Sequence, residues 1–513
     1  MKLFLIALFS GLLIAAADAA LIATNLKCGY WQNPLGVDEA APRISWQLQA
    51  VTPDERGQSQ TAYQILVASS VGELDKNKGD LWDSGKIISD SSLNIAYAGK
   101  PLASEQKVFW KVRAWDAKKK VSDWSPVATW TMGLLNSNDW NGSWLCATTN
   151  SPLPIFRREF AVKPGLQRAL IFICGLGQYE LSANGAKVDN ALLSPGWSKY
   201  DKTCLYDTFE LTSVLTNGIN ALGVMLGNGM CNVEANQRYT KFTGSFGPPK
   251  FIAQLHLFYT DGTSEVIASD AQWLTTPGPI TFSSVFGGED FDARLELAGW
   301  DQAGFDASTW LPPIVTNGPG GMLRGLSCAA PPLRAFETLA PVKTNSLKPN
   351  VTIYDLGQNA PVMARLAVKG EAGSRVRIIP AELLKADGSV DRQSVGDKIA
   401  YWQYTLSGSG DEKYFSKFFY HGCRYLQVER FAATNSAELP TIKSIEGIVV
   451  HTASANAGEF ACSNDLFNRI HTLIRWAQRA NLVSVITDCP HRERLGWLEQ
   501  YHLNGPSLRY RSR

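Results

Sequence analysis

The interpretation of this chain turns on residues 487–500, which read Thr487-Asp488-Cys489-Pro490-His491-Arg492-Glu493-Arg494-Leu495-Gly496-Trp497-Leu498-Glu499-Gln500. The stretch combines one Asp, two Glu, two Arg, one His and one Trp within fourteen positions. It follows the point at which the hydrophobic period of the chain changes from that of strands to that of helices. It therefore marks the passage from a β-rich region to the beginning of an α-helical one.

The residues before this stretch have the pattern of an amphipathic helix. Apolar side chains recur at helical spacing from Asn464 onward, and Ser463 is the candidate N-cap. We predict that this helix runs to about Ile486. The apolar positions that would form one face are Leu466, Ile470, Leu473, Ile474 and Ala477. Unless other helices cover that face, we expect the C-terminal region to be mobile or prone to aggregation.

Two interpretations of the next residues stay open from pattern alone. In the first, Asp488 caps a second helix, Pro490 occupies its first turn, and Glu493, Arg494 and Glu499 lie on its exposed face. In the second, the charges form a reactive site. A carboxyl beside an indole is pushed toward its protonated form by desolvation, whereas a neighbouring Arg pulls its pKa down. Such opposed effects are typical of a general acid, one of the two carboxyls that glycoside hydrolysis uses.

The region upstream is predicted to be almost entirely β. Short alternating strands separated by turn residues predict three β domains, because 513 residues are too many for one core. We place an immunoglobulin- or fibronectin-like sandwich at 20–134, a larger jelly roll at 135–340 and a third sandwich at 341–457. The start of a helical domain follows at 458–513. The predicted fold class is multidomain and mainly β, followed by helices.

The N-terminus has the pattern of a secretory signal peptide over residues 1–19. Lys2 precedes an apolar run from Leu3 to Ala17, and Ala17-Asp18-Ala19 offers small residues for cleavage. A membrane anchor is the alternative, but the run is short for a bilayer span. We expect a secreted or periplasmic protein with no membrane span after removal of the signal.

Charge and cysteine content exclude several classes of function. The formal net charge is +2 and no long basic run occurs, which argues against a nucleic-acid partner. The nine cysteines are scattered and include no C-x-x-C pair, so neither a zinc ribbon nor a redox motif is indicated. We expect most of them to fill buried apolar space.

Several separate motifs resemble those of bacterial α-L-rhamnosidases, glycoside hydrolase family 78. The stretch at 487–497 resembles the family's catalytic segment, and the remaining motifs occur in the family's order. These motifs are Trp82-Asp83-Ser84-Gly85, Trp110-Lys111-Val112-Arg113-Ala114-Trp115-Asp116, Gly175-Leu176-Gly177-Gln178-Tyr179-Glu180, Ser194-Pro195-Gly196-Trp197, Gly287-Gly288-Glu289, Tyr354-Asp355-Leu356-Gly357-Gln358-Asn359 and Phe419-Tyr420-His421-Gly422-Cys423-Arg424-Tyr425.

The resemblance implies an enzyme that removes terminal α-L-rhamnose from glycans or glycosides by inversion. It implies that residues 458–513 begin an (α/α)6 barrel, the six-hairpin catalytic domain. Glu493 would be the general acid. Asp488 and Arg492 would hold rhamnose hydroxyls and tune Glu493, and Trp497 would form an apolar wall. The expected partner is a rhamnose-containing oligosaccharide, polysaccharide or glycoside.

The chain departs from the family pattern at two points. Many members carry Gly-Asp shortly after the Gly-Trp pair, where this chain has Leu498-Glu499-Gln500, so Glu499 as a substrate-binding residue is the less direct assignment. The second departure is length. By resemblance the general base lies far downstream on a part of the barrel that this chain lacks. We therefore expect a truncated chain with impaired hydrolysis.

One further candidate lies in the predicted jelly roll. Asp189 and Asn190 precede the motif at 194–197 and offer oxygen ligands for a sugar or for calcium, which some relatives bind in this domain. Two oxygen ligands do not make a calcium site, so an ordinary surface turn is the alternative. The sequence predicts no other metal and no cofactor.

Two rivals to the enzyme interpretation remain. The first is a non-catalytic carbohydrate-binding protein built from the three β domains. The second keeps the fold but changes the sugar, because related barrels cleave other glycosides. Hydrolysis of an aryl α-L-rhamnoside separates the first rival from the enzyme, and a panel of aryl glycosides separates the second.

Overall fold

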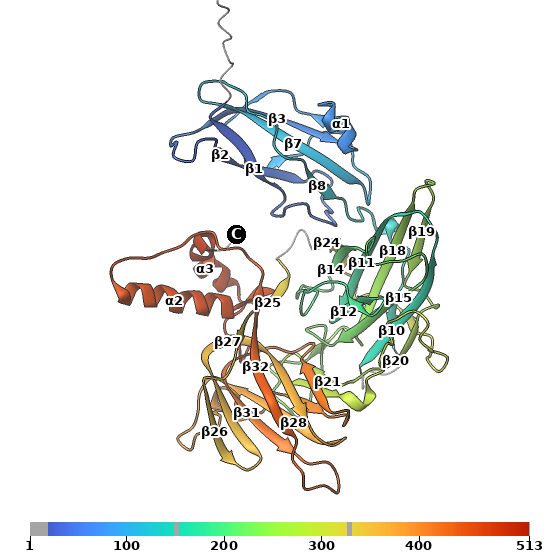
Figure 1. The fold of residues 1–513 in the computed structure, drawn as a ribbon, viewed down its shortest axis with the longest axis vertical. Coiled ribbons are helices and arrows are strands. Elements are labelled where there is room, and N and C mark those ends of the chain that lie inside the picture. Colours follow the sequence, from blue (N-terminus) through green and yellow to red (C-terminus); the bar gives the residue numbers. More distant parts are fainter. Residues whose placement is uncertain (1–18, 148–152, 326–330, 512–513) are drawn as a thin grey trace, which may run out of the picture. The chain divides into compact units, whose positions relative to one another are not determined.

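The structure is a computed structural model that describes residues 19–147, 153–325 and 331–511 (Figure 1). The predicted signal peptide therefore lies outside the described residues, except for its last residue. The chain forms two compact units, Met1–Leu135 and Asn136–Arg513, and each is described by itself. No helix among the described residues is long and apolar enough to cross a membrane.

The first unit is a β sandwich of two sheets. One sheet has the order β1-β2-β6 and the other β4-β3-β7-β8, with β5 paired to β3. The strands and the short helix are β1 (Leu21–Cys28), β2 (Arg43–Ala50), β3 (Gln60–Ala68), α1 (Val71–Asp75), β4 (Trp82–Asp83), β5 (Ile87–Ile88), β6 (Ile95–Ala96), β7 (Lys107–Asp116) and β8 (Ala128–Thr131). Trp46, Trp110 and Trp130 are buried together in the core. Trp110, Val112 and Ala114, at alternating positions of β7, are all fully buried.

The second unit begins with a jelly roll of two further sheets. Their orders are β13-β12-β15-β10-β20 and β23-β9-β18-β11-β14-β24, with β19 on β18. Their elements, with two 3-10 turns and a separate two-stranded pair, are η1 (Ser137–Asp139), β9 (Trp144–Cys146), β10 (Pro154–Val162), β11 (Leu166–Leu176), β12 (Gln178–Ala183), β13 (Ala186–Lys187), β14 (Thr203–Glu210), β15 (Gly218–Gly227), β16 (Asn232–Val233), β17 (Gly244–Ser245), β18 (Lys250–Tyr259), β19 (Ser264–Ala268), β20 (Leu274–Pro277), η2 (Ala293–Leu295), β23 (Ile314–Thr316) and β24 (Met322–Gly325). Phe156, Phe251 and Trp273 pack edge to face between the two sheets.

A ten-stranded sheet follows, and it draws strands from both sides of residue 340. Its order is β21-β22-β29-β28-β31-β27-β32-β25, with β26 and β30 on β27. The elements, with one 3-10 turn, are β21 (Ile280–Ser284), β22 (Gly288–Asp292), β25 (Leu333–Leu339), β26 (Lys343–Lys348), β27 (Val351–Lys369), β28 (Arg375–Ala381), η4 (Gln393–Val395), β29 (Tyr401–Thr405), β30 (Asp411–Phe415), β31 (His421–Phe431) and β32 (Thr441–Thr452). Because β22 pairs in parallel with β29, the hydrogen-bonded sheet crosses the predicted domain boundary. The prediction of several β sheets is confirmed.

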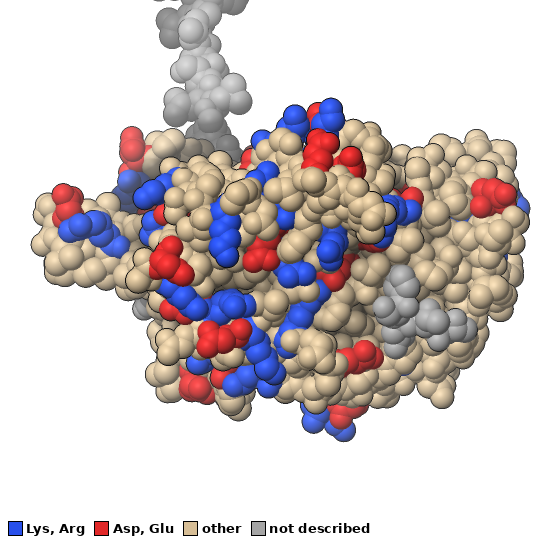
Figure 2. All heavy atoms as spheres, turned by 90° about the horizontal axis from the view of Figure 1, so that it is seen from below, with Lys and Arg blue, Asp and Glu red and all other residues tan. Residues whose placement is uncertain are grey.

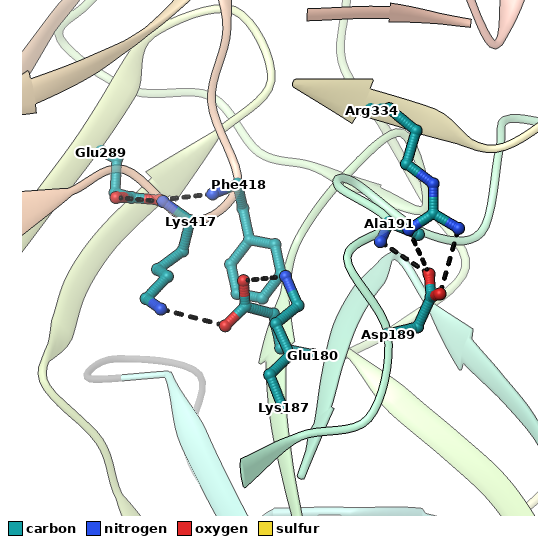
Figure 3. A network of polar contacts seen from close by, with 8 residues as sticks. All are labelled: Glu180, Lys187, Asp189, Ala191, Glu289, Arg334, Lys417 and Phe418. Carbon is teal, nitrogen blue, oxygen red and sulfur yellow. Dashed lines mark hydrogen bonds and ion pairs between the residues drawn. The ribbon is translucent and has the colours of Figure 1, made fainter. Parts of the chain in front are cut away.

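A polar network fixes the jelly roll to the ten-stranded sheet (Figure 3). Lys417 Nζ donates to Glu180 Oε2 on β12 at 3.0 Å. Glu289, on β22, is fully buried and accepts from the backbone N–H of Phe418 at 2.6 Å and from Tyr414 Oη at 2.7 Å. Burial raises the pKa of Glu289, and these donors oppose that effect only in part. Lys417 thus joins the two β regions, because its side chain pairs with Glu180 and its backbone N–H donates to buried Glu289 at 2.9 Å.

The predicted helix ends earlier than expected. Helix α2 spans Asp465–Ala480, and its N-cap is Asn464 rather than Ser463, because the Asn464 side chain accepts from the Leu466 N–H. The prediction of a helix to Ile486 was wrong. Asn481 ends it, and a tight hairpin follows, formed by β33 (Leu482–Val483) and β34 (Val485–Ile486). Ser484 turns that hairpin at a φ of 70°. Helix α3 spans Leu498–Arg511.

Candidate functional site

The candidate site is a closed loop between β34 and α3. Thr487 and Gly496 form an antiparallel bridge at its neck, and the Asp488 N–H donates to Leu495 O at 3.2 Å. Residues 488–497 contain no helix. The interpretation in which Asp488 caps a second helix was therefore wrong. The antiparallel bridge between Thr487 and Gly496 closes the loop, so the chain turns back before α3 begins.

The tip of the loop rests on the first residues of β31. Pro490 O accepts from the Gly422 N–H at 2.9 Å. A Cβ at Gly422 would lie only 2.5 Å from Pro490 Cγ, so this approach requires glycine. The loop is thus positioned by the ten-stranded sheet.

Arg494 fastens the other side of the loop. Its side chain is only 2% exposed, and its Nη1 donates to Tyr420 O at 2.6 Å while its Nη2 donates to Phe286 O at 3.1 Å. The guanidinium also lies 5.3 Å from the centre of the Phe419 ring. Its assignment to an exposed face was wrong, because its backbone φ of 50° turns the side chain into the protein. Arg494 therefore anchors the segment that carries Glu493.

Glu493 has both carboxylate oxygens engaged. Oε1 accepts from Lys241 Nζ at 2.5 Å, and Oε2 accepts from Trp497 Nε1 at 3.2 Å. Arg492 Nη2 lies 3.9 Å from Oε1. The Glu493 side chain is 15% exposed, so it remains accessible at the mouth of the loop. The structure thus brings together three of the predicted site residues, Arg492, Glu493 and Trp497.

These contacts decide the protonation state of Glu493. The hydrogen bond from Lys241 lowers the pKa of Glu493 below its ordinary value, and desolvation only partly opposes it. The Lys241 charge, the Trp497 hydrogen bond and the Arg492 charge lower the pKa further. The indole was expected to raise this pKa by exclusion of water, but its N–H instead stabilises the ionised carboxylate. Glu493 is therefore ionised at neutral pH in this conformation.

The predicted site residues around Glu493 differ in their exposure to solvent. Asp488 is half-buried, and its Oδ2 accepts from Cys489 Sγ at 3.1 Å. Arg492 is exposed, and Trp497 is 44% exposed. Glu499 is exposed in the first turn of α3. A flat aromatic face and exposed hydrogen-bonding groups at one mouth suit a sugar ring.

Two contacts of the loop were missed by sequence reasoning. His491 Nδ1 lies 3.3 Å from Glu382 Oε2, and Glu382 Oε1 accepts from Asn359 Nδ2 at 2.8 Å. Burial lowers the pKa of His491, so its ring is neutral at pH 7. Lys241 was missed as well, because it lies 252 positions before Glu493. No local pattern reports pairing over that distance.

The accessory candidates Asp189 and Asn190 are placed differently from one another. Asp189 Oδ2 lies 2.8 Å from Arg334 Nη1 and accepts from the Ala191 N–H at 2.6 Å, and its Oδ1 accepts from Arg334 Nη2 at 3.0 Å (Figure 3). Asn190 is exposed. Since Arg334 occupies both oxygens of the carboxylate, this pair does not fit a calcium site. Within residues 19–147, 153–325 and 331–511, no group of three His, Cys, Asp or Glu side chains is arranged to hold a metal.

The charged side chains and the cysteines are placed as the composition led us to expect. On the face that Figure 2 shows, Lys and Arg lie among Asp and Glu. Eight cysteines fall in the described part of the chain, and six of them are buried. Cys328 lies outside it.

Comparison with known proteins identifies the domains. A family model described as the alpha-L-rhamnosidase N-terminal domain matches residues 165–337, and the bacterial alpha-L-rhamnosidase concanavalin-like domain matches 345–451. The bacterial alpha-L-rhamnosidase 6 hairpin glycosidase domain matches 455–512, which include the candidate loop. The chain therefore contains bacterial α-L-rhamnosidase domains. An N-terminal immunoglobulin domain of the Rha78A type matches 23–136.

Individual members of the α-L-rhamnosidase family are similar along most of the chain. An alpha-L-rhamnosidase of Formosa agariphila is 31% identical over 504 residues, which cover 92% of this chain and 52% of that protein. The solved alpha-L-rhamnosidase of Dictyoglumus thermophilum is 38% identical with a TM-score of 0.87, over 96% of this chain and 56% of that one.

A third relative is known with a bound sugar. The Streptomyces avermitilis alpha-L-rhamnosidase complexed with L-rhamnose is 27% identical with a TM-score of 0.88, over 96% of this chain and 64% of that one. The chain spans about half the length of the curated relatives at about 30% identity that it matches.

Proposed function

We propose that this chain carries the acid side of an exported α-L-rhamnosidase. The substrate would be a glycan or glycoside that ends in α-L-rhamnose, and the protein would be secreted or periplasmic. Nucleic acid has no role in this proposal. The observation that carries it is the pair formed by Glu493 and Trp497, since it sets an accessible carboxyl beside an exposed indole within the segment that matches the glycosidase domain.

In the proposed mechanism, Glu493 acts in its protonated form, which is populated as the pH falls toward its pKa, and it donates that proton to the glycosidic oxygen as the bond from that oxygen to the rhamnose anomeric carbon breaks. A water molecule attacks the anomeric carbon from the opposite face and loses its proton to a base, which gives inversion. Asp488 and Arg492 would hold rhamnose hydroxyls, with Glu499 at the periphery. Trp497 would pack against the apolar face of the ring.

The general base is not assigned to any described residue. Inversion requires a second carboxyl about 6.5–9.5 Å from the acid, with room for water between them. We propose that residues 458–513 correspond to the beginning of an (α/α)6 barrel and that such a barrel supplies the base.

A second candidate function is sugar binding without hydrolysis. The lowered pKa of Glu493 favours it, because an ionised carboxylate accepts hydrogen bonds from sugar hydroxyls but has no proton to donate. Under this alternative the same residues bind rhamnose and no bond is broken. Both candidate functions include rhamnose binding, but only the enzyme would release free rhamnose from a rhamnoside.

The test uses two substrates that differ in their need for an acid. Methyl α-L-rhamnoside has a poor leaving group that requires protonation, whereas 4-nitrophenyl α-L-rhamnoside has a good one. We expect release from both, with Glu493→Gln reducing methyl rhamnoside hydrolysis far more than nitrophenyl rhamnoside hydrolysis. Glu499→Gln is the matched control and should change the two rates similarly.

Three outcomes would contradict parts of this proposal. Saturable L-rhamnose binding with no release above a blank would leave only the binding protein. Equal effects of Glu493→Gln on both substrates would remove Glu493 from the acid role. Cleavage of another sugar in a panel of aryl glycosides, with none of rhamnose, would show that the proposed substrate is wrong.

A further inference from the structure

Lys241 reaches the candidate site from a distant part of the chain. It lies between β16 and β17, within the residues that match the N-terminal rhamnosidase domain rather than the glycosidase domain. Its Nζ lies 2.5 Å from Glu493 Oε1, and its side chain is 36% exposed. The shortest polar contact of Glu493 therefore comes from an accessory domain.

The segment that carries Lys241 is held in place on both sides. The Tyr239 N–H donates to Ile399 O at 3.0 Å, and Tyr239 is buried. The Phe242 ring packs edge to face on Phe286 with ring centres 5.4 Å apart. Lys241 thus projects from between two anchored aromatic residues, which reduces the entropy lost when its ammonium pairs with a carboxylate.

Phe286 contacts the segments on both sides of the Lys241–Glu493 pair. Its ring supports Phe242, next to Lys241, and its carbonyl oxygen accepts from Arg494, next to Glu493. One buried residue, itself 0% exposed, therefore sets the position of both the ammonium and the carboxylate. A pair arranged in this way from two domains is more than a chance surface contact.

We propose that Lys241 is a positioning residue for Glu493, which it holds against the Trp497 indole from the accessory domain. This inference rests on the proposed function, since it matters for chemistry only if Glu493 is the acid. It makes the jelly roll part of the catalytic apparatus. Removal of the accessory contact would change the acid without touching the sugar-binding residues.

The groups that contact Glu493 determine the change expected in its pKa. Lys241 faces it from the accessory domain, Arg492 and Trp497 face it from its own loop, and Cys489 Sγ accepts from its N–H at 3.2 Å. Arg494 is directed away into the core. Because Lys241 contributes the largest lowering effect on the pKa of Glu493, its loss should raise that pKa.

The experiment measures the Glu493 carboxyl directly in the full chain. Glutamate labelled with 13C at the carboxyl carbon is followed by NMR through a pH titration, and Glu493→Gln assigns the signal. We expect Lys241→Met to shift the titration midpoint of Glu493 upward and Lys241→Arg to restore it. Lys163→Met is the matched control, because it breaks the Lys163–Glu265 ion pair elsewhere in the jelly roll and should leave the midpoint unchanged.

The outcomes separate this inference from the proposed function. An unchanged Glu493 midpoint in Lys241→Met would overturn the positioning role, whatever the enzyme does. If the Glu493 midpoint shifts upward in a chain that neither binds rhamnose nor hydrolyses rhamnosides, the Lys241–Glu493 pair is supported and the proposed function is refuted. If hydrolysis is measurable, the basic limb of its pH profile should move to higher pH in Lys241→Met, because a general acid is active while protonated.

Discussion

The loop at 488–497 and helix α2 belong to the same matched domain, yet the rest of the protein holds them very differently. The loop is anchored by buried Arg494 and by the contact of Pro490 with Gly422. Helix α2 contacts the β region through Trp476 and Arg479, while its main apolar positions face solvent. Leu466, Ile470, Leu473 and Ile474 are between 41% and 70% exposed.

This difference shows which part of the protein holds the candidate site in place. Anchoring of the loop depends on backbone carbonyls of the β regions and not on neighbouring helices. The site residues are therefore preorganised by the β domains, which agrees with an accessory lysine that completes the pair. The exposed face of α2 is where we expect mobility or self-association.

The largest expected effect comes from replacement of the anchor. Arg494→Met removes two hydrogen bonds to buried carbonyls, each a bond from a charged donor, so opening of the loop should become easier by about 3 kcal/mol. Native-state hydrogen exchange of residues 488–497 measures this as lost protection. Arg492→Ala, at an exposed position, should change protection by less than about 0.5 kcal/mol. Equal protection in wild type and Arg494→Met would mean that the anchor contributes nothing.

The next effect tests the close approach of the loop to β31. Gly422→Ala places a Cβ about 2.5 Å from Pro490, which must shift at a cost of roughly 1–3 kcal/mol. Gly505→Ala in α3 is the control, because a Cβ there meets nothing within 4 Å and a helical Gly to Ala change stabilises by about 0.5–1 kcal/mol. Thermal unfolding and loop exchange both report the difference. If the two variants behave alike, the contact does not position the loop.

A smaller effect is expected on α2. Leu473→Gln should change stability by less than about 0.5 kcal/mol, because the side chain is 70% exposed, and it should reduce self-association measured by light scattering. Arg469→Gln, also exposed on α2, should not reduce it. Strong exchange protection throughout α2, residues 465–480, in a monomer would contradict the expected mobility of this helix.

The smallest effect is the dependence of the loop on pH. The folded pKa of Glu493 is lowered, so its stabilising contribution is present above the ordinary glutamate pKa and is lost as pH falls through the lowered value. The Trp497 hydrogen bond weakens over the same acidic range. Incorporated 5-fluorotryptophan, read by 19F NMR, should show that titration at Trp497, and Glu493→Gln should abolish it. A Trp497 signal that does not change with pH would count against the pair.

Sequence reasoning worked best where a pattern is local. Short alternating strands predicted a mainly β region, and helical spacing predicted α2. It failed where tertiary contacts outweigh local propensity. The turn at Ser484 and the inward side chain of Arg494 depend on positive backbone φ values that no periodicity reports.

The candidate site was predicted in part for the same reason. Arg492, Glu493 and Trp497 are close in sequence and meet in space. Lys241 and Glu382 come from other domains or strands, so only the folded chain brings them to the loop. The pKa of Glu493 depends mainly on the first of these and could not be foreseen from the segment alone.

The central claim is that the anchored loop forms a rhamnose site, and titration of L-rhamnose into the 5-fluorotryptophan-labelled chain tests it most directly. Trp497→Phe assigns the signal, and D-glucose is the control sugar. The account predicts a saturable shift of the Trp497 resonance with L-rhamnose, little with D-glucose, and none in Arg492→Ala. A Trp497 signal that L-rhamnose leaves unchanged, or that both sugars move equally, would contradict it.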